Sequence, residues 1–185
     1  MFGNLTNRFV STVASLTALV FSSYTGNDAA FSNLALQRQG DMLTVQCRLV
    51  SAFDHDFEEF FRSGKPVNVW FMLQVHSGRE VVLEEFFYHR VEFDPMSSYF
   101  EIYLHDQQYT VSARSYAELI EVVSLFDHTI SLLDIDHEQS LIVSVTGYLA
   151  EIRLDTMSEP FDLMLLWNFK RPVVRRSCIL NELET

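Results

Sequence analysis

Residues 66–93 read PVNVWFMLQVHSGREVVLEEFFYHRVEF, and this stretch decides the fold class. Every second residue over 67–75 is Val, Phe or Leu, which is the period of a strand that buries one face. The sequence Ser77-Gly78-Arg79 is typical of a hairpin turn, and a second, longer strand is expected over 80–93. A long antiparallel hairpin is therefore the first predicted unit of the fold.

The same two-residue period recurs outward from this hairpin in both directions. Further strands are expected at 31–37, 42–50, 99–104, 109–112, 129–133, 141–154 and 161–169. Gly147 is the expected position of a β-bulge within the strand at 141–154. Neighbouring segments are joined by tight turns, which favours antiparallel pairing, since parallel strands need long crossovers. The sequence therefore predicts a mostly β fold: an antiparallel β-sandwich, or a curled meander sheet, of about eight strands with two short helices.

Two segments change from this period to a helical one. Phenylalanines at helical spacing predict a short helix over 54–62 that lays an aromatic stripe on the sheet, with Gly64 as its C-terminal cap. Ser115 and Glu118 form the S-x-x-E pattern of a capping box. A second helix is expected to continue from there to Phe126.

The first 30 residues are expected to serve targeting rather than the fold. Residues 9–24 carry no charge and follow Arg8, as the apolar region of a signal peptide follows a basic one. The stretch is shorter than the roughly 20 apolar residues of a comfortable membrane span. We expect a signal or anchor segment at 1–30, an antiparallel β domain at 31–172 and a polar C-terminal tail at 173–185. The expected location is periplasmic or otherwise extracytoplasmic, whether the first segment is cleaved or retained as an anchor.

The charge of the chain excludes some classes of partner. There are 13 Lys and Arg against 25 Asp and Glu, which gives a formal charge of −12. Nucleic-acid binding needs clustered bases, so no nucleic-acid partner is expected, and membrane contact is expected only through an uncleaved N-terminal segment. The one basic cluster is expected to be a solvated end, or else a contact to a headgroup or an acidic partner: Lys170, Arg171, Arg175 and Arg176.

The two cysteines are predicted to be structural. Cys47 alternates with Leu43, Val45 and Leu49, so it is expected on the inward face of a strand as a small buried hydrophobe. A disulfide with Cys178 remains an alternative in an oxidising compartment. No neighbouring histidine pattern favours a catalytic thiol.

Two acidic clusters that contain histidine are candidates for metal chemistry. Asp54-His55-Asp56 is explained as well by acids that complement a helix N-terminus, and Asp134–Glu138 lacks the glycine and the closing glutamate of a calcium loop. The other histidines are dispersed without a ligand spacing: His76, His89, His105 and His128. No cofactor, metal site or catalytic residue is therefore expected.

Several short motifs follow one another in a set order along the chain. They are Asp41-Met42-Leu43 at a strand start, Phe60–Val67 (FFRSGKPV) from a helix end into a strand, Val91–Asp94, Tyr99, and the helix at Ser115–Phe126. This order resembles an uncharacterised bacterial family of exported proteins, known only as a domain of unknown function. The resemblance covers residues 31–170 and implies an envelope location and a β-rich fold. It supplies no catalytic residue.

Aromatic residues on strands give the main indication of function. Such residues are enriched at recognition hot spots, and the candidate interaction residues are Trp70, Phe86, Tyr88, Tyr99 and Tyr103. We expect a non-catalytic interaction module of the bacterial cell envelope, which binds another envelope protein through a sheet face or edge. Two alternatives stay open: a lipid or saccharide carrier with an apolar cavity between the sheet and the helix at 53–61, and a metal-dependent hydrolase built on the two acidic clusters.

Overall fold

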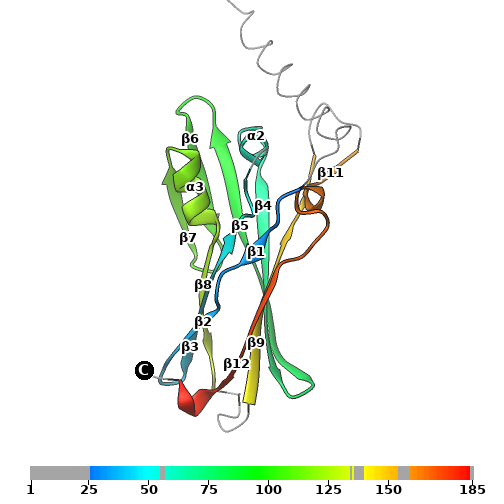
Figure 1. Ribbon diagram of the computed structural model, residues 1–185. Helices are drawn as coiled ribbons and strands as arrows, with labels where there is room; N and C mark the ends of the chain where they lie inside the picture. The colour runs from blue at the N-terminus through cyan, green and yellow to red at the C-terminus, as the bar shows by residue number, and fades with distance from the viewer. Residues whose placement is uncertain (1–25, 55–56, 134, 136–139, 154–158, 184–185) are drawn as a thin grey trace, which may run out of the picture.

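The described part of the chain folds into two main antiparallel β-sheets with two short α-helices, which confirms the predicted mostly β class (Figure 1). The computed structural model describes residues 26–54, 57–133, 135, 140–153 and 159–183. Nearly all of the predicted signal or anchor segment lies outside the described residues. Residues 26 and 27 already belong to the fold, since the Asn27 backbone N–H donates to the Leu166 carbonyl at 2.8 Å.

The larger sheet has six strands in the order β12-β9-β4-β5-β6-β7, and every neighbouring pair is antiparallel. The strands are β4 (Val67–Ser77), β5 (Glu80–Asp94), β6 (Tyr99–Leu104), β7 (Tyr109–Ala113), β9 (Ser140–Leu149) and β12 (Val173–Ile179). Strands β4 to β7 form a meander joined by turns. The hairpin that the sequence predicted is β4–β5, and it lies at the centre of this sheet.

The smaller sheet is built around β3 (Met42–Val50). Strand β8 (Leu125–Ser131) pairs along one edge of β3, and β1 (Ala30–Phe31) and β2 (Ala35–Gln39) pair one after the other along the opposite edge. A separate two-stranded piece joins β10 (Glu151–Ile152) to β11 (Phe161–Asp162).

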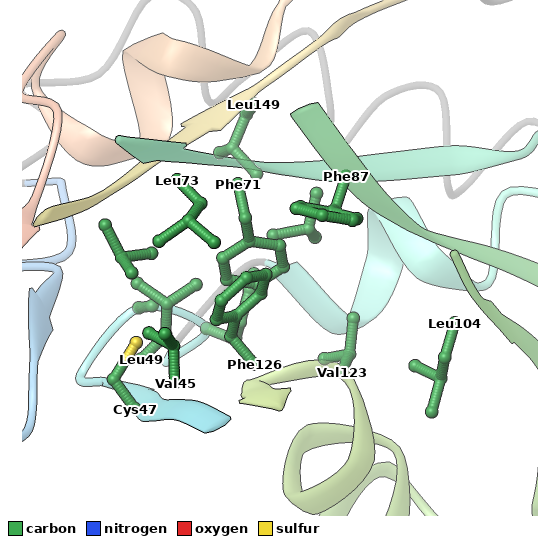
Figure 2. Close-up of a cluster of buried hydrophobic side chains, with 14 of the residues drawn as sticks. Val45, Cys47, Leu49, Phe71, Leu73, Phe87, Leu104, Val123, Phe126 and Leu149 are labelled. Carbon is green, nitrogen blue, oxygen red and sulfur yellow. The ribbon is translucent and has the colours of Figure 1, made fainter. Parts of the chain in front are cut away.

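The two sheets face each other across one hydrophobic core (Figure 2). Phe126 of β8 contacts Phe71 of β4 and Phe87 of β5, with ring centroids 5.3 and 5.5 Å apart. Cys47 and Leu49 of β3 are buried on the same inner side. Full burial of one such large side chain contributes about 1.5–3 kcal/mol, so the period-two alternation of the strands is what holds the layers together.

The short helix α2 (Phe57–Phe61) and the 3₁₀ helix η1 (Leu163–Trp167) close one end of the core with aromatic rings. Phe53 is the centre of this packing, since its ring centroid lies 5.1 Å from that of Phe57 and 6.0 Å from that of Trp167. The Trp167 indole N–H donates to the Ala52 carbonyl at 2.7 Å, so its one polar group is satisfied inside the core. The predicted phenylalanine stripe is confirmed.

The second helix, α3 (Tyr116–Val123), begins at the predicted cap. The Ser115 hydroxyl accepts from the Glu118 backbone N–H at 3.2 Å, and the Glu118 carboxylate accepts from the Arg114 N–H at 2.7 Å. The return bond thus reaches one residue further back than the motif implies. The helix ends before Phe126, which lies in β8 rather than in the helix.

The segment predicted as a closing strand at 161–169 is mainly helical. Only Phe161–Asp162 is extended, and η1 follows, with the Asp162 carboxylate accepting from the Met164 N–H at 2.8 Å as its cap. Four of the five η1 residues are buried, and a short, continuously apolar run does not distinguish a strand from a buried helical turn.

The C-terminal region also differs from the sequence prediction. Val173–Ile179, assigned to a polar tail, is strand β12 and pairs with β9 over seven residues. Cys178 and Leu180 are buried, the latter in the 3₁₀ helix η2 (Leu180–Glu182). Because β12 is an edge strand, most of its side chains are solvated, and its composition therefore resembled a tail.

Gly147 is not at a β-bulge. The β4–β9 register continues through the Phe71–Gly147 pair, and the irregularity of the sheet lies between Val75 and His76 in the pairing of β4 with β5. A Cβ at Gly147 would lie 3.3 Å from both Phe31 Cζ and Pro172 Cγ. A side chain at this position would therefore press on both neighbours, which would have to move by a few tenths of an ångström.

Candidate functional site

The candidate site is the face of the six-stranded sheet that points away from the core, which we call the outer face. The alternation that buries Val69, Phe71 and Leu73 of β4 turns Trp70 and Met72 to this side. Trp70 lies opposite Tyr88 of β5 on one side and opposite Tyr148 of β9 on the other. Aromatic side chains from adjacent strands are therefore placed side by side.

These rings form a continuous aromatic row across four strands: Tyr148, Trp70, Tyr88 and Tyr103. The ring centroids of Tyr148 and Trp70 are 5.9 Å apart and nearly parallel, at an interplanar angle of 10°. Trp70 and Tyr88 are 5.1 Å apart, and Tyr88 and Tyr103 are 5.9 Å apart. All these separations fall in the range of favourable aromatic pairing, which gives the row a defined shape.

A cation lies at the β9 end of the row. The Arg171 guanidinium carbon is 5.6 Å from the centroid of the Tyr148 ring, within the range of a cation–π contact. Burial raises the pKa of the Tyr148 hydroxyl above its ordinary value, although the nearby Arg171 charge acts in the opposite direction. Tyr148 therefore presents a neutral hydroxyl beside a fixed positive charge.

The centre of the outer face carries no charged side chain. On β4 the outward residues are Asn68, Trp70, Met72, Gln74 and His76, and on β9 they are Ile142, Ser144, Thr146 and Tyr148. Both strands lie wholly within the described residues, and none of these nine positions is Asp, Glu, Lys or Arg. Charged side chains come from the flanking strands and from Arg171, which lies over the Tyr148 ring. In a chain of formal charge −12, this is an unusual surface.

All five residues predicted for interaction lie on this face, as the strand pairing shows: Trp70 on β4, Phe86 and Tyr88 on β5, and Tyr99 and Tyr103 on β6. Phe86 lies opposite Met72 and is 48% exposed. Tyr99 lies opposite Asp94 at the end of β6, apart from the aromatic row. The structure brings four of the five together, and their role in binding stays a prediction.

A second group of functional side chains is enclosed between the sheets. His89 on β5 and Asp106 in the β6–β7 turn have side chains that are 0% exposed, and His89 Nε2 lies 3.0 Å from Asp106 Oδ1. His89 Nδ1 lies 2.8 Å from the Val123 carbonyl oxygen at the end of α3. Since both ring nitrogens face oxygen acceptors, the geometry fits an imidazolium paired with a carboxylate.

Asp106 also connects the two sheets. Its Oδ2 accepts from the Asp127 backbone N–H of β8 at 3.1 Å, and its carbonyl oxygen lies 2.9 Å from His128 Nδ1. Burial acts to raise the pKa of the Asp106 carboxyl, but the hydrogen bond and charge of His89, together with hydrogen bonds from Asp127 and Gln107, hold that pKa below its usual range. The pair therefore joins β5, the β6–β7 turn, α3 and β8.

The predicted acidic clusters contribute no metal site to the described part of the chain. Residues 55–56, 134 and 136–139 lie outside the described residues, and Asp54 is exposed. Among the described residues there is no group of three or more His, Cys, Asp or Glu side chains arranged to hold a metal ion. The hydrolase interpretation gains no support from them.

Both cysteines are buried and free. Burial raises the pKa of the Cys47 thiol to about 12. Burial also raises the pKa of the Cys178 thiol, against the opposing charge of Arg176. Neither thiol is activated for nucleophilic chemistry, because the reactive form is the thiolate.

Among the described residues, aromatic side chains pack against one another in the space proposed for a lipid or saccharide. Phe60 stacks on Phe161 with ring centroids 5.3 Å apart, next to the Phe53 packing described above. Two hollows lie elsewhere, one of about 860 Å³ beside Arg38 and Arg176 and one of about 660 Å³ beside Tyr99. Neither lies between the larger sheet and α2.

Sequence reasoning missed the buried pair and part of the aromatic row. His89 and Asp106 are 17 residues apart and match no catalytic spacing, but His89 occupies an inward position between Phe87 and Val91, where a polar side chain needs a partner. Tyr148 occupies an outward position of β9. The alternation of inward and outward positions along the strands was the signal that could have found both the buried pair and Tyr148.

Comparison with known protein families, with curated proteins and with solved structures found no match to this chain. The resemblance to an exported bacterial family therefore stays a prediction. Within the described residues, no helix combines the length and the apolar character needed to cross a membrane.

Proposed function

We propose that this chain is a non-catalytic protein-interaction module of the bacterial cell envelope, which binds a protein partner through the outer face. The observation that carries the proposal is the aromatic centre of that face, where the outward residues of β4 and β9 carry no charge and charged side chains come from the flanking strands and from Arg171 at one end. This is the composition of a protein interface, in which charges are depleted at the core and aromatic residues and Met are enriched.

Such a face costs free energy when it stays in water. A solvated face of an antiparallel sheet ordinarily carries polar and charged residues. Here Phe86 is 48% exposed beside Met72, and the aromatic row runs through Trp70. A partner that covered these side chains would release their hydration and would gain anchoring contacts of the kind that dominate binding energies.

The enclosure of the His–Asp pair supports a role without catalysis. A general acid or base must come within hydrogen-bond distance of its substrate. The His89 and Asp106 side chains are 0% exposed, and each already has protein partners. The pair thus serves to fasten the two sheets.

The extracytoplasmic location rests on the sequence of the N-terminal segment. Residues 9–24 are uncharged and follow Arg8, as in a signal or anchor segment. The charge of −12 adds a reason why the module itself would stay clear of an anionic membrane surface.

The test is site-specific photo-crosslinking in cells that express the full chain. A photoreactive amino acid in place of Phe86 on the outer face is expected to give a discrete protein adduct on irradiation. The control replaces Met42, which is 43% exposed on the other sheet and thus matches the 48% exposure of Phe86. The control is expected to give no such adduct.

Equal labelling from the two positions, or no protein adduct from position 86, would refute the proposal. An adduct of position 86 with a lipid or a polysaccharide would instead favour the small-ligand alternative. The ligand would then bind on the outer face and not in the cavity that the sequence predicted.

A further inference from the structure

The flanks of the outer face carry opposite charge. On the β12 side, Arg175 points outward and Arg171 lies on the Tyr148 ring. On the β5–β6 side the outward charges are four carboxylates and one guanidinium: Glu84, Glu92, Asp94, Glu101 and Arg90. Arg90 forms an ion pair with Glu92, which leaves this flank negative. A partner that fits this face must carry the reverse pattern.

The strand register places Arg175 and Glu84, the charges at the two ends, in one line across four strands. Arg175 of β12 lies opposite Ser144 of β9, Ser144 lies opposite Gln74 of β4, and Gln74 lies opposite Glu84 of β5. The line therefore begins with a base, crosses two uncharged side chains and ends with an acid. Arg175 and Glu84 are both exposed.

The next two lines across the face contribute apolar and aromatic side chains. One begins with Val173 and ends with Phe86, so both of its ends are apolar. The other has Tyr148 and Trp70 as its central pair. If each line is reversed and laid on itself, Val173 meets Phe86, Thr146 meets Met72, Tyr148 meets Trp70, and the opposite charges of Arg175 and Glu84 meet in the charged line.

A two-fold axis between β9 and β4, parallel to the strands, performs this reversal. It sets β12 of one copy over β5 of the second copy, so that Arg175 meets Glu84 twice and Tyr148 meets Trp70 twice. An axis across the strands would instead place the two arginine-bearing flanks against each other. Aligned sheets pack with their strands within about 30° of each other, and the axis along the strands produces this arrangement.

We infer that the partner of the outer face is a second copy of this chain, in an isologous dimer with its two-fold axis along β4 and β9. The inference rests on the proposed function and names the occupant of the same site. Each contact made by one copy is repeated by the other, as in any two-fold interface.

The net charge of −12 opposes this dimer at long range. At physiological ionic strength, charges separated by more than about 8 Å are largely screened. The strands at the centre of the interface contribute no charge, and the Arg175–Glu84 contacts are attractive. We therefore expect a dimer that weakens at low salt rather than at high salt.

The test is sedimentation velocity on the full chain and its charge-reversal variants. The wild-type chain is expected to dimerise, and Arg175→Glu or Glu84→Arg alone is expected to weaken dimerisation by about tenfold or more, since each homodimer then has two like-charge contacts. An equimolar mixture of the two variants is expected to recover the dimer, because both contacts of the mixed dimer have opposite charge. Arg79→Glu, in the β4–β5 turn, is the control of equal charge change and should leave dimerisation unchanged.

A wild-type chain that stays monomeric over the whole concentration range, or a mixture that fails to recover the dimer, would overturn the inference. If the chain is monomeric while position 86 still crosslinks to a different protein, the second copy is excluded and the interaction function stands. If position 86 crosslinks to no protein either, both fall.

Discussion

At the scale of single residues, the buried pair of a histidine and an aspartate is held by several partners. His89 and Asp106 are fully enclosed, and the pair is stable there because every polar atom of the ring has a partner. Removing two charges from water costs several kcal/mol per ion before their attraction repays it. Such a pair contributes little net stability but strongly penalises the loss of one member.

The lowered pKa of Asp106 predicts an acid-sensitive fold. A carboxyl whose pKa is depressed in the folded state contributes stability above its unfolded pKa of about 3.9, and that contribution is lost as the pH falls through the folded value. Asp106→Asn should therefore lower the free energy of unfolding at pH 7, and the difference from wild type should shrink as the pH falls below about 4. Urea unfolding between pH 2 and 7 measures it. A difference that stays constant over this range would contradict the assignment.

The cysteines allow a prediction of thiol reactivity. With the pKa of Cys47 raised to about 12, almost no Cys47 thiolate exists at pH 8, and the raised pKa of Cys178 reduces its thiolate fraction as well. A disulfide-exchange reagent should react slowly with the native protein and should titrate both thiols once the chain is unfolded without reductant. Failure to find two thiols after unfolding would indicate a disulfide instead.

At the scale of elements, strands were predictable where apolar and polar residues alternate strictly. The strands β3, β4 and β6 follow from their sequence because each has one fully apolar side. The 3₁₀ helix η1 did not follow, because its apolar residues have no period. Strand β12 did not follow either, because only part of an edge strand is buried, and tertiary pairing with β9 decides its structure.

The inclusion of β12 and η2 in the fold predicts a loss of stability on truncating Leu180. This side chain is 0% exposed, so Leu180→Ala should lower the free energy of unfolding by about 2–5 kcal/mol, the usual cost of a buried Leu→Ala change. Val173→Ala, at a position that is 45% exposed on β12, is the matched control and should cost far less. Chemical denaturation compares the two variants. If Leu180→Ala left the free energy of unfolding unchanged, the prediction of a polar tail at 173–185 would stand instead.

At the scale of the whole molecule, the two faces of the larger sheet have different tasks. The inner face forms the core with β3 and β8, and the buried pair fastens the layers, so the outer face is held in one shape. The aromatic residues of this face were predictable one by one from the sequence. The placement of these residues beside Tyr148 and Met72 was not predictable, because it depends on β9 pairing with β4 across a long stretch of chain.

The most direct test of the account is the effect of Trp70→Lys on the crosslink from position 86. Trp70 is outward-facing and only partly buried, so the variant should keep its far-UV circular dichroism and its melting temperature, while a charge at the centre of the interface should abolish the protein adduct. Trp70→Phe, which keeps the aromatic row, should retain the adduct. An adduct of unchanged yield in the folded Trp70→Lys chain would contradict the claim that the outer face is the binding surface.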